Sequence, residues 1–367
     1  MQKILILSNI DIGLYKFRKE LIQELVKKYD VYVSTPYGEF VPNLQDLGCT
    51  HIDVDMERRG TNPINELKLL LKYIKLIGEI KPNIVLTYTI KPNVYGGIAC
   101  RIKRTPYIVN ITGLGSAVEN KGLLKNIALF LYKLALKNVS CTFFQNTENL
   151  QLFVNRKIVR DKYRLIPGSG VNLNEYQLID YPPEQNIEFV FISRILKEKG
   201  IDQYLDAAEF IRKKYPNTKF HICGFCEDDY EEKLNKFQDD GIIEYHGMVH
   251  DIKKIYERVH CTIHPTYYPE GMSNVLLESA ACGRPIITTD RSGCKEIVDD
   301  GINGFIVDQQ NSQDLISKIE KFLGLSYEDK KNMGLAGRRK VESQFSRHII
   351  VEAYNYEICK VLKNYGD

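Results

Sequence analysis

The sequence alternates between short apolar runs and longer segments in which apolar residues recur every three or four positions. The first apolar run is KILILS at 3–8, and the amphipathic segment FRKELIQELVKKY follows at 17–29. Runs of this length predict buried strands, and the helical spacing predicts amphipathic helices. Further strands of the first half are expected at 31–36, 50–54, 83–88, 107–113 and 141–146. Such alternation indicates parallel sheets that helices cover on both faces.

The alternation stops near the middle of the chain and then starts again. IPGSGVN at 166–172 leads into a polar, proline-containing stretch at 173–186. The restart predicts two α/β domains, 1–166 and 167–345, and a last helix over 346–367 that we expect to return to the first domain. Strands of the second domain are expected at 188–193, 219–224, 241–247, 261–266, 285–290 and 304–307. Ligands of open α/β sheets bind beyond the carboxyl ends of the strands, so the residues at those ends are informative.

The composition is that of a soluble globular protein, with 44% hydrophobic and 26% charged residues. No segment reaches the roughly 18 apolar residues of a membrane span. The nine cysteines are scattered, as expected of reduced thiols in a cytoplasmic protein. Charge is uneven: residues 1–166 hold 25 Lys and Arg against 14 Asp and Glu, net +11, and the rest is net −8. A basic first half favours an anionic partner such as a membrane, a polyphosphate or nucleic acid.

Two glutamates, Glu270 and Glu278, flank a Gly-Met-Ser-Asn turn in PEGMSNVLLESAACGRP. A helix is expected over 273–282, with Glu270 just before it and Glu278 about one turn inside. The free N–H groups at the start of a helix bind anions, and carboxylates accept hydrogen bonds from sugar hydroxyls. The pattern fits a nucleotide sugar, although a pair of capping residues on an ordinary helix would also explain it. The N–H groups expected to be free are those of Met272, Ser273, Asn274 and Val275.

Two cations, Arg194 and Lys199, follow the first strand of the second domain in SRILKEKG. At the carboxyl end of a strand they can neutralise a pyrophosphate and stabilise a departing nucleoside diphosphate. A solvated charged loop is the alternative interpretation.

Together these motifs resemble the family-4 retaining glycosyltransferases of GT-B fold, along essentially the whole chain. The resemblance rests on Arg194 with Lys199, on Glu270-x7-Glu278 and on GINGFIV at 301–307. It implies two facing Rossmann-like α/β domains with a cleft between them. TYTIKPNVYGG at 87–97 and NITGLG at 110–115 are similar to the subgroup that extends lipid-pyrophosphate-linked oligosaccharides, including N-acetylgalactosaminyltransferases.

The resemblance also implies roles for individual residues. Arg194 and Lys199 would hold the diphosphate, and Glu270 the transferred sugar, which makes these three the catalytic candidates. Glu278 would hold the ribose, and in this family the loops at 224 and 247–248 pass near the nucleobase. The full set of donor-binding candidates is Gly13, Gly224, Gly247, Met248, Gly271, Met272, Ser273, Asn274 and Glu278.

Acceptor contacts are expected from Lys91 and Thr112. Lys91 is placed to pair with acceptor phosphates, but an ordinary loop lysine explains it equally well. Thr112 aligns where many family members carry a histidine, so a histidine-assisted reaction is not expected here. A retaining front-face displacement needs no protein base, because the leaving phosphate can take the acceptor proton.

Asp53-Val-Asp55 is formally the DxD metal motif of the other large glycosyltransferase fold. Here it ends a short strand in an architecture that, by the resemblance, dispenses with bound metal. We therefore expect neither a metal nor another cofactor.

The segment KGLLKNIALFLYKLALKN at 121–138 is strongly amphipathic. Lys125, Lys133 and Lys137 fall within an arc of about 120° on a helical projection, and the remaining face is nearly all apolar. It is either a half-buried core helix or an interfacial helix on an anionic membrane leaflet.

The sequence thus predicts a metal-independent, retaining hexosyltransferase that uses a UDP-sugar. The acceptor is expected to be a lipid-pyrophosphate-linked saccharide in surface polysaccharide or glycan assembly. The protein would act at the inner face of the cell membrane as a peripheral protein, without a nucleic-acid partner. The alternatives are an enzyme like the UDP-sugar 2-epimerases, and a non-catalytic subunit that binds sugar nucleotides.

Overall fold

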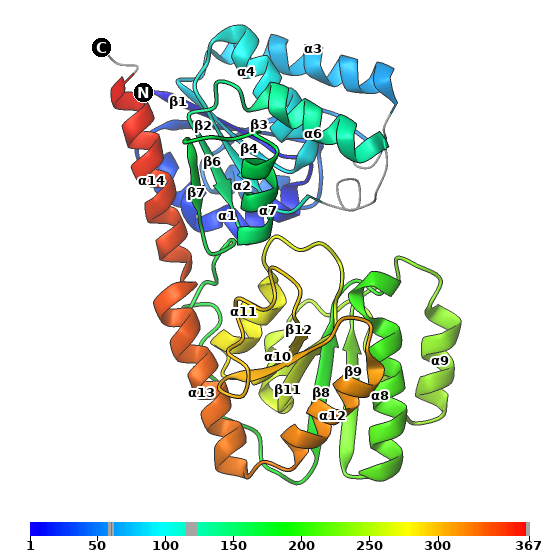
Figure 1. Cartoon of the computed structure of the whole chain (residues 1–367). Coiled ribbons are helices and arrows are strands. Elements are labelled where there is room, and N and C mark those ends of the chain that lie inside the picture. The colour runs from blue at the N-terminus through cyan, green and yellow to red at the C-terminus, as the bar shows by residue number, and fades with distance from the viewer. Residues whose placement is uncertain (58–59, 61, 115–122, 365–367) are drawn as a thin grey trace. The chain divides into compact units, whose positions relative to one another are not determined.

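The computed structural model describes residues 1–57, 60, 62–114 and 123–364 (Figure 1). The chain divides into two compact units. The N-terminal unit comprises Met1–Gly170 and Arg347–Asp367, and the C-terminal unit comprises Val171–Ser346.

In the described part of the N-terminal unit, seven parallel strands form one sheet in the order β3-β2-β1-β4-β5-β6-β7. The strands are β1 Lys3–Leu7, β2 Asp30–Thr35, β3 Thr50–Asp53, β4 Ile84–Tyr88, β5 Tyr107–Ile111, β6 Cys141–Phe144 and β7 Tyr163–Leu165. The helical segments are α1 Asp11–Val26, α2 Val41–Asp46, α3 Pro63–Ile80, η1 Pro92–Gly96, α4 Gly97–Lys103, α6 Leu123–Ala135, α7 Thr147–Asn155 and α14 Arg347–Asn364.

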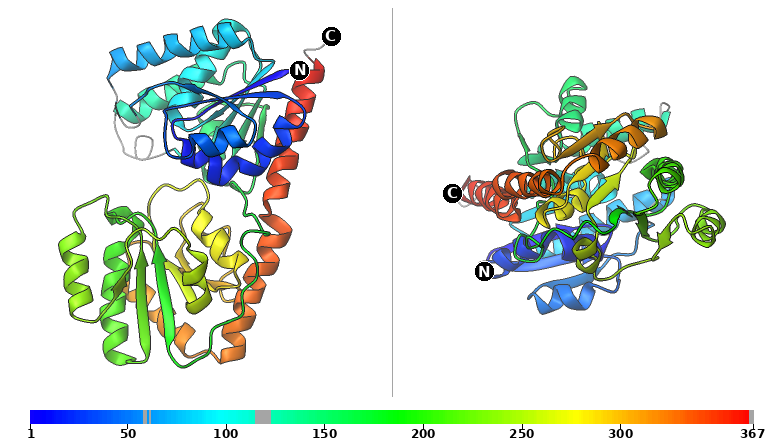
Figure 2. Two further views of the ribbon diagram at one scale, coloured as in Figure 1. Left: turned by 180° about the vertical axis from the view of Figure 1, so that it is seen from behind. Right: turned by 90° about the horizontal axis from the view of Figure 1, so that it is seen from below.

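This sheet separates two hydrophobic cores, because successive side chains of a strand point to opposite faces. On β1, Leu5 and Leu7 join the core beneath α3, α4 and α6, whereas Ile4 and Ile6 join the core beneath α1 and α14. Helices α3, α4 and α6 lie together on their side of the sheet (Figures 1 and 2). The apolar runs of the sequence are therefore strands buried on both faces, as expected of parallel sheets.

The C-terminal helix α14 belongs to the N-terminal unit and is held there by polar contacts as well as by packing. Arg347 Nη1 donates to Glu20 Oε2 at 2.8 Å, and Nη2 donates to the carbonyl oxygen of Gly170 at 3.0 Å. Gly170 has φ +67°, and a Cβ there would lie 2.8 Å from Arg347 Cα, so glycine allows this approach.

In the described part of the C-terminal unit, six parallel strands follow the order β10-β9-β8-β11-β12-β13. The strands are β8 Ile187–Ile192, β9 Thr218–Cys223, β10 Glu244–Tyr245, β11 Cys261–His264, β12 Ile286–Thr289 and β13 Gly304–Val307. The helical segments are η2 Lys197–Lys199, α8 Ile201–Lys214, α9 Glu231–Asp239, α10 Lys253–Arg258, α11 Asn274–Ala281, α12 Ser312–Leu323 and α13 Tyr327–Gln344. Two parallel-sheet α/β units are what the sequence predicts, and this part of the fold prediction is confirmed.

The start of α1 differs from the expectation. The helix begins at Asp11 rather than near residue 17, so Gly13 lies in its first turn and is not a loop glycine. Ile10 occupies the N-cap position without a side-chain capping bond, and such a start gives no sequence signal.

His260, which precedes β11, is buried in a setting that fits only the neutral ring. Its Nδ1 accepts from the N–H of Glu188 at 3.1 Å, and its Nε2 lies 3.3 Å from the carbonyl oxygen of Pro183. A proton on Nδ1 would face a backbone donor. Burial lowers the pKa of His260 to about 4; Glu188 opposes this shift, and Arg284 and Lys330 add to it.

We expect the stability of the protein to fall as the pH drops from about 6.5 to about 4. Over that range His260 takes up a proton in the unfolded state but stays neutral in the folded state. The lowering of its pKa corresponds to roughly 3 kcal/mol in the free energy of unfolding. The measurement is urea unfolding at pH 7 and pH 4.5. His260→Asn should lose stability at pH 7 but should show a decline between the two pH values that is smaller by about 2–3 kcal/mol.

His348→Asn provides the matched control, because His348 is exposed on α14. It should leave the pH dependence unchanged. Parallel pH dependences of the wild type and His260→Asn would contradict this account.

Candidate functional site

A buried ion pair joins the loops that follow β8 and β11. Lys199 ends the short turn η2, and its Nζ donates to Glu270 Oε1. The side chains are 9% and 17% exposed. Burial alone would raise the pKa of Glu270, but the adjacent Lys199 outweighs it and holds that pKa at about 2. The sequence-predicted cation and carboxylate are therefore in direct contact, and the carboxylate is charged at neutral pH.

A glycine makes this contact possible. Gly200 has φ +80°, and a Cβ there would lie 2.1 Å from the carbonyl oxygen of Pro265. The two loops are also joined by the N–H of Tyr267, which donates to the carbonyl oxygen of Glu198 at 2.9 Å. A side chain at position 200 would force the loops apart and separate Lys199 from Glu270.

Arg194 lies close to the same pair. Its guanidinium is 5.5 Å from the ring centroid of Tyr268, and Lys199 Nζ is 4.8 Å from that centroid. Arg194 Nη1 also forms an ion pair with Glu227, in the loop after β9. The structure thus brings the two predicted phosphate-binding cations to one tyrosine ring. Neither Tyr268 nor Glu227 was predicted, although Glu227 lies in the loop at 224 that, by the resemblance, was expected to pass near the nucleobase.

A second glycine turn supports the loop that carries Glu270. Gly293 has φ +90°, and a Cβ there would lie 2.9 Å from Glu270 Cβ. The N–H of Ser273 donates to the carbonyl oxygen of Gly293 at 2.8 Å. The expectation that this N–H is free to bind an anion is therefore wrong. The remaining donors at the start of α11 are the N–H groups of Met272, Asn274 and Val275.

Polar atoms on either side of this loop, at the end of β11 and the start of α11, are buried without partners. Both ring nitrogens of His264 and Oδ1 of Asn274 have no hydrogen-bond partner among the described residues. His264 Nε2 is 4.0 Å from Glu270 Oε1, which is too long for a hydrogen bond. Burial lowers the pKa of His264, so its ring is neutral at neutral pH. Buried polar atoms of this kind are costly, and a polar ligand in the site would satisfy them.

Glu278 lies just past the middle of α11 and is partly buried. Its neighbour is Tyr176, and burial together with the Glu278 carboxylate raises the pKa of this tyrosine. Glu278 therefore keeps its carboxylate next to a neutral phenol, which the sequence did not predict.

The two candidate glycines of the nucleobase loops are also in contact. The N–H of Gly224 donates to the carbonyl oxygen of Gly247 at 2.7 Å. Gly224 has φ +146°, and a Cβ there would lie 1.7 Å from the carbonyl oxygen of Ser193. Met248 is exposed beside them. The loops after β8, β9 and β10 thus converge at the carboxyl edge of this sheet, where ligands of open α/β sheets bind.

The remaining candidates belong to the N-terminal unit. Thr112 follows β5 directly and is partly buried. Lys91 Nζ forms an ion pair with Glu66 Oε1 at 2.5 Å, and both side chains are 12% exposed. Lys91 and Glu66, with Asp55 among others, line a pocket of about 290 Å³. The pairing gives Lys91 a structural role, and its role in acceptor binding stays a prediction.

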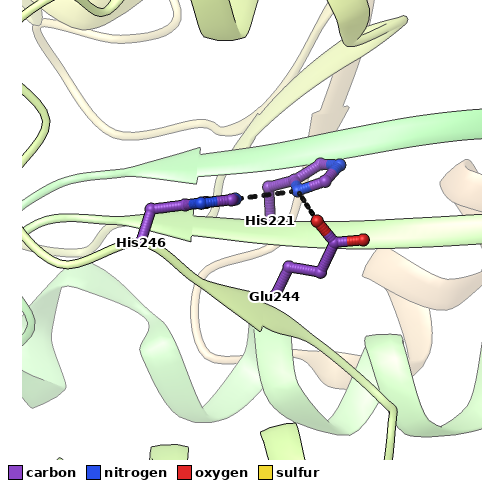
Figure 3. Close-up of side chains that lie close together, drawn as sticks. All are labelled: His221, Glu244 and His246. Atoms are coloured by element: carbon purple, nitrogen blue, oxygen red, sulfur yellow. Dashed lines mark hydrogen bonds and ion pairs between the residues drawn. The ribbon is translucent and has the colours of Figure 1, made fainter.

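A second polar cluster comprises His221 of β9, Glu244 of β10 and His246, which follows β10. His221 Nδ1 is 3.0 Å from His246 Nε2 and 3.4 Å from Glu244 Oε2, an arrangement of three possible metal ligands (Figure 3). Arg258 and Lys219 lie 3.6 Å and 3.9 Å from the Glu244 carboxylate.

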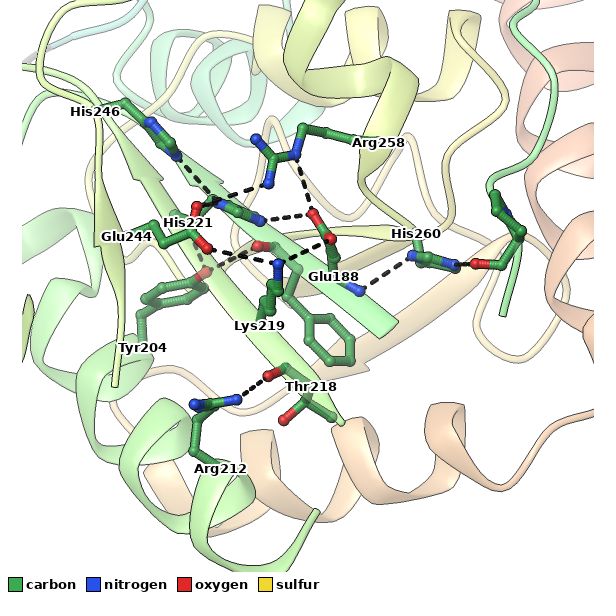
Figure 4. A network of polar contacts seen from close by, with 12 residues as sticks. Glu188, Tyr204, Arg212, Thr218, Lys219, His221, Glu244, His246, Arg258 and His260 are labelled. Atoms are coloured by element: carbon green, nitrogen blue, oxygen red, sulfur yellow. Dashed lines mark hydrogen bonds and ion pairs between the residues drawn. The ribbon is translucent and has the colours of Figure 1, made fainter. Parts of the chain in front are cut away.

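Charges around this cluster oppose a divalent cation. Glu188 accepts from His221 Nε2 at 2.9 Å and from Arg258 Nε at 3.1 Å (Figure 4). The two carboxylates of the network are therefore already compensated by Arg258 and Lys219, and a metal ion would be placed against like charges. We interpret the network as a structural one.

Comparisons with known proteins agree with this geometry. Residues 3–146 match the family model described as glycosyl transferase 4-like, and residues 180–340 match the model of glycosyl transferases group 1. The two matches fall on the two parallel-sheet units, and the second contains Arg194, Lys199, Glu270 and Glu278.

Relatives of similar length align over nearly the whole chain. One is the N,N'-diacetylbacillosaminyl-diphospho-undecaprenol alpha-1,3-N-acetylgalactosaminyltransferase of Campylobacter jejuni, 26% identical, with 98% of each chain covered. Another is the capsular polysaccharide biosynthesis glycosyltransferase CapM of Staphylococcus aureus, 27% identical, covering 96% of this chain and 95% of the relative.

Solved structures show the same fold at lower identity. A glycosyltransferase from Rickettsia africae matches with a TM-score of 0.80 and 19% identity, covering 99% of both chains. Anabaena Alr3699/HepE in complex with UDP-glucose also matches with a TM-score of 0.80 and 19% identity, covering 99% of this chain and 100% of that one. The family matches, the relatives and the two parallel-sheet units together identify the chain as a family-4-like glycosyltransferase of GT-B fold.

Proposed function

We propose that the protein transfers a sugar from a UDP-sugar to a lipid-pyrophosphate-linked saccharide, with retention of configuration and without a bound metal. The observation that carries the proposal is the buried Lys199–Glu270 pair beside the unpartnered polar atoms of His264 and Asn274. A sugar supplies hydroxyl groups that donate to and accept from such atoms. A diphosphate supplies the anion that Arg194, Lys199 and the start of α11 can bind.

In this proposal the donor lies along the carboxyl edge of the C-terminal sheet. Glu270 and Asn274 bind the transferred sugar, Glu278 binds the ribose, and Gly224 and Gly247 approach the base. Support for UDP comes from the structural relative whose complex contains UDP-glucose. A sugar such as an N-acetylhexosamine agrees with the name of the Campylobacter relative.

The acceptor class is also proposed from the relatives. One acts, by its name, on a saccharide linked to diphospho-undecaprenol, and the other is named for capsular polysaccharide biosynthesis. Thr112 and Lys91 are the acceptor contacts that we propose. Thr112 is too weak a base at neutral pH to take the proton of the acceptor hydroxyl, so the leaving phosphate takes it.

A peripheral position at the membrane suits such an acceptor. None of the described helices has the length and hydropathy needed to cross a membrane. Helix α6 buries one apolar side and exposes another. Lys133, within α6, and Lys137, just beyond its end, are exposed next to the solvent-facing apolar side. This arrangement agrees with an interfacial helix. The exposed apolar residues of α6 are Leu124, Ile127, Phe130 and Leu134.

The first prediction concerns Glu278. Glu278→Ala removes the proposed acceptor of the ribose hydroxyls, so donor affinity should fall by roughly 1.5–3 kcal/mol, or about 10- to 150-fold. The measurement is calorimetric titration with UDP. Glu209→Ala, an exposed glutamate of α8, is the matched control and should bind like the wild type. Unchanged UDP affinity of Glu278→Ala with an intact fold would rule out the ribose assignment.

The second prediction concerns the reaction and metal. Product should form only when a UDP-sugar and a polyprenyl-diphosphate saccharide are both present, and EDTA should leave the rate unchanged. Charge stabilisation by Arg194, Lys199 and the start of α11 is the reason. Asp53 of the formal DxD motif has a structural role instead of a metal-binding one in this proposal, because it accepts a hydrogen bond from the N–H of Tyr37 at 3.1 Å.

The opposite results are equally informative. Loss of activity in EDTA with recovery in Mn²⁺ would make Asp53 and Asp55 metal ligands. Conversion of the UDP-sugar without an acceptor would favour the epimerase alternative, and binding without any turnover would favour a non-catalytic subunit.

The third prediction concerns the membrane. Replacing Lys125, Lys133 and Lys137 with glutamate should weaken binding to anionic vesicles by at least 100-fold, because each lysine near such a surface contributes about 1 kcal/mol. The effect should shrink as salt rises, and UDP binding should not change. Co-sedimentation with phosphatidylglycerol vesicles measures it. Equal pelleting of wild type and variant would assign α6 to the core alone.

A further inference from the structure

A groove of about 610 Å³ lies at the amino ends of β6 and β7. Leu136 and Val139 precede β6, and Ile158 and Val159 precede β7; these four side chains are buried and line the groove. One carboxylate, Asp161, lies at the rim, where five cations also lie: Lys133, Lys137, Lys157, Arg160 and Lys162. The groove is therefore apolar inside and strongly basic at its edge.

The groove is separate from the proposed acceptor contacts. Thr112 follows the carboxyl end of β5, whereas the groove lies at the amino ends of the neighbouring strands in the same sheet. An occupant of the groove is thus bound at the opposite edge of the N-terminal sheet from Thr112.

The five cations are exposed and uncompensated. Over the described ranges, none of them forms an ion pair, in contrast to Lys91, Arg164 and Arg347 of the same unit. Five positive charges against one negative charge attract an anion, and an apolar interior beside them favours one that also carries hydrocarbon.

The position of Lys157 indicates that the fold does not require its side chain. The N–H of Lys157 donates to the carbonyl oxygen of Val154, and that of Ile158 to the carbonyl oxygen of Phe153, both at 2.9 Å. This is the Schellman end of α7, and Lys157 occupies its left-handed position with φ +52°. Glycine is the preferred residue there, so a lysine places a cation at the groove against the backbone preference.

We propose that this groove binds the phosphate head group of an anionic phospholipid. This proposal rests on the peripheral membrane position proposed above. The rim cations bind the phosphate, and the apolar interior packs the glycerol and the first methylene groups. Phe130 and Leu134 of α6 also line the groove and are exposed, so they extend the apolar surface toward the acyl chains. These apolar neighbours favour a lipid over nucleic acid, which the test below includes as an outcome.

The experiment compares binding of the full chain to vesicles of phosphatidylcholine with 30% phosphatidylglycerol and to vesicles of pure phosphatidylcholine. The variant Lys157→Gly/Arg160→Gln/Lys162→Gln should bind the anionic vesicles at least tenfold more weakly and should melt at the same temperature as the wild type. The single variant Lys157→Gly should weaken binding without lowering the melting temperature, because glycine suits the backbone at that position.

A matched control removes three charges elsewhere. Lys213, Lys236 and Lys254 are exposed in the C-terminal unit, and their replacement with glutamine should leave vesicle binding unchanged. An equal loss in this control would show that net charge alone controls binding, and the groove proposal would fail. Wild-type pelleting of both groove variants would overturn it as well.

Competition separates a lipid site from a site for any phosphate. Dihexanoyl phosphatidylglycerol below its micelle concentration should displace the protein from vesicles, whereas inorganic phosphate at the same concentration should not. Equal competition by phosphate would overturn the proposal, and so would a single-stranded oligonucleotide that binds the wild type but not the groove variant. UDP-induced stabilisation and transfer of the sugar to the acceptor, measured on the same samples, test the proposed transferase function independently of the groove.

Discussion

The buried ion pair of Lys199 and Glu270 is the interaction on which the rest of the C-terminal site depends. Removing two charges from water is expensive, and the attraction between them offsets the cost only when the geometry holds them in contact. That geometry comes from Gly200 and Gly293, where a side chain would push the supporting loops apart. Loss of one partner would leave an unpaired buried charge, at a cost of about 3–5 kcal/mol. The catalytic candidates are therefore also structural residues.

The same pair constrains the chemistry. With a pKa of about 2, the Glu270 carboxylate is a very weak base at neutral pH, and a general base works best with a pKa near the working pH. His264 is neutral, but its side chain is 2% exposed and its Nε2 lies 4.0 Å from this carboxylate. Neither group is suited to take the proton of an incoming hydroxyl. This agrees with the proposed front-face displacement, in which the departing phosphate would take that proton.

The sequence predicted what depends on short-range pattern and missed what depends on contacts between distant loops. Apolar runs located the strands except β7, whose three residues are exposed and form no apolar run. The strand-end rule with the family resemblance pointed to Arg194, Lys199, Glu270 and Glu278, of which the structure brings the first three together. Glu227 and Gly293 reach the site only through folding, so no spacing revealed them. Tyr268 lies two residues before Glu270, but its contacts with Arg194 and Lys199 depend on the loop after β8. Periodicity also could not decide the fate of α6, because this helix is apolar on both its buried and its exposed sides.

The division of charge between the two halves of the chain has a physical consequence for binding. Residues 167–367 are net −8 and yet contain the proposed site for an anionic donor. The long-range field there opposes the donor, so affinity has to come from Arg194, Lys199 and the backbone donors at close range. In the basic first half, attraction to an anionic surface acts over roughly 8–10 Å and is weakened by salt. Buried contacts are screened much less, so salt should release this protein from an anionic surface before it releases the nucleotide.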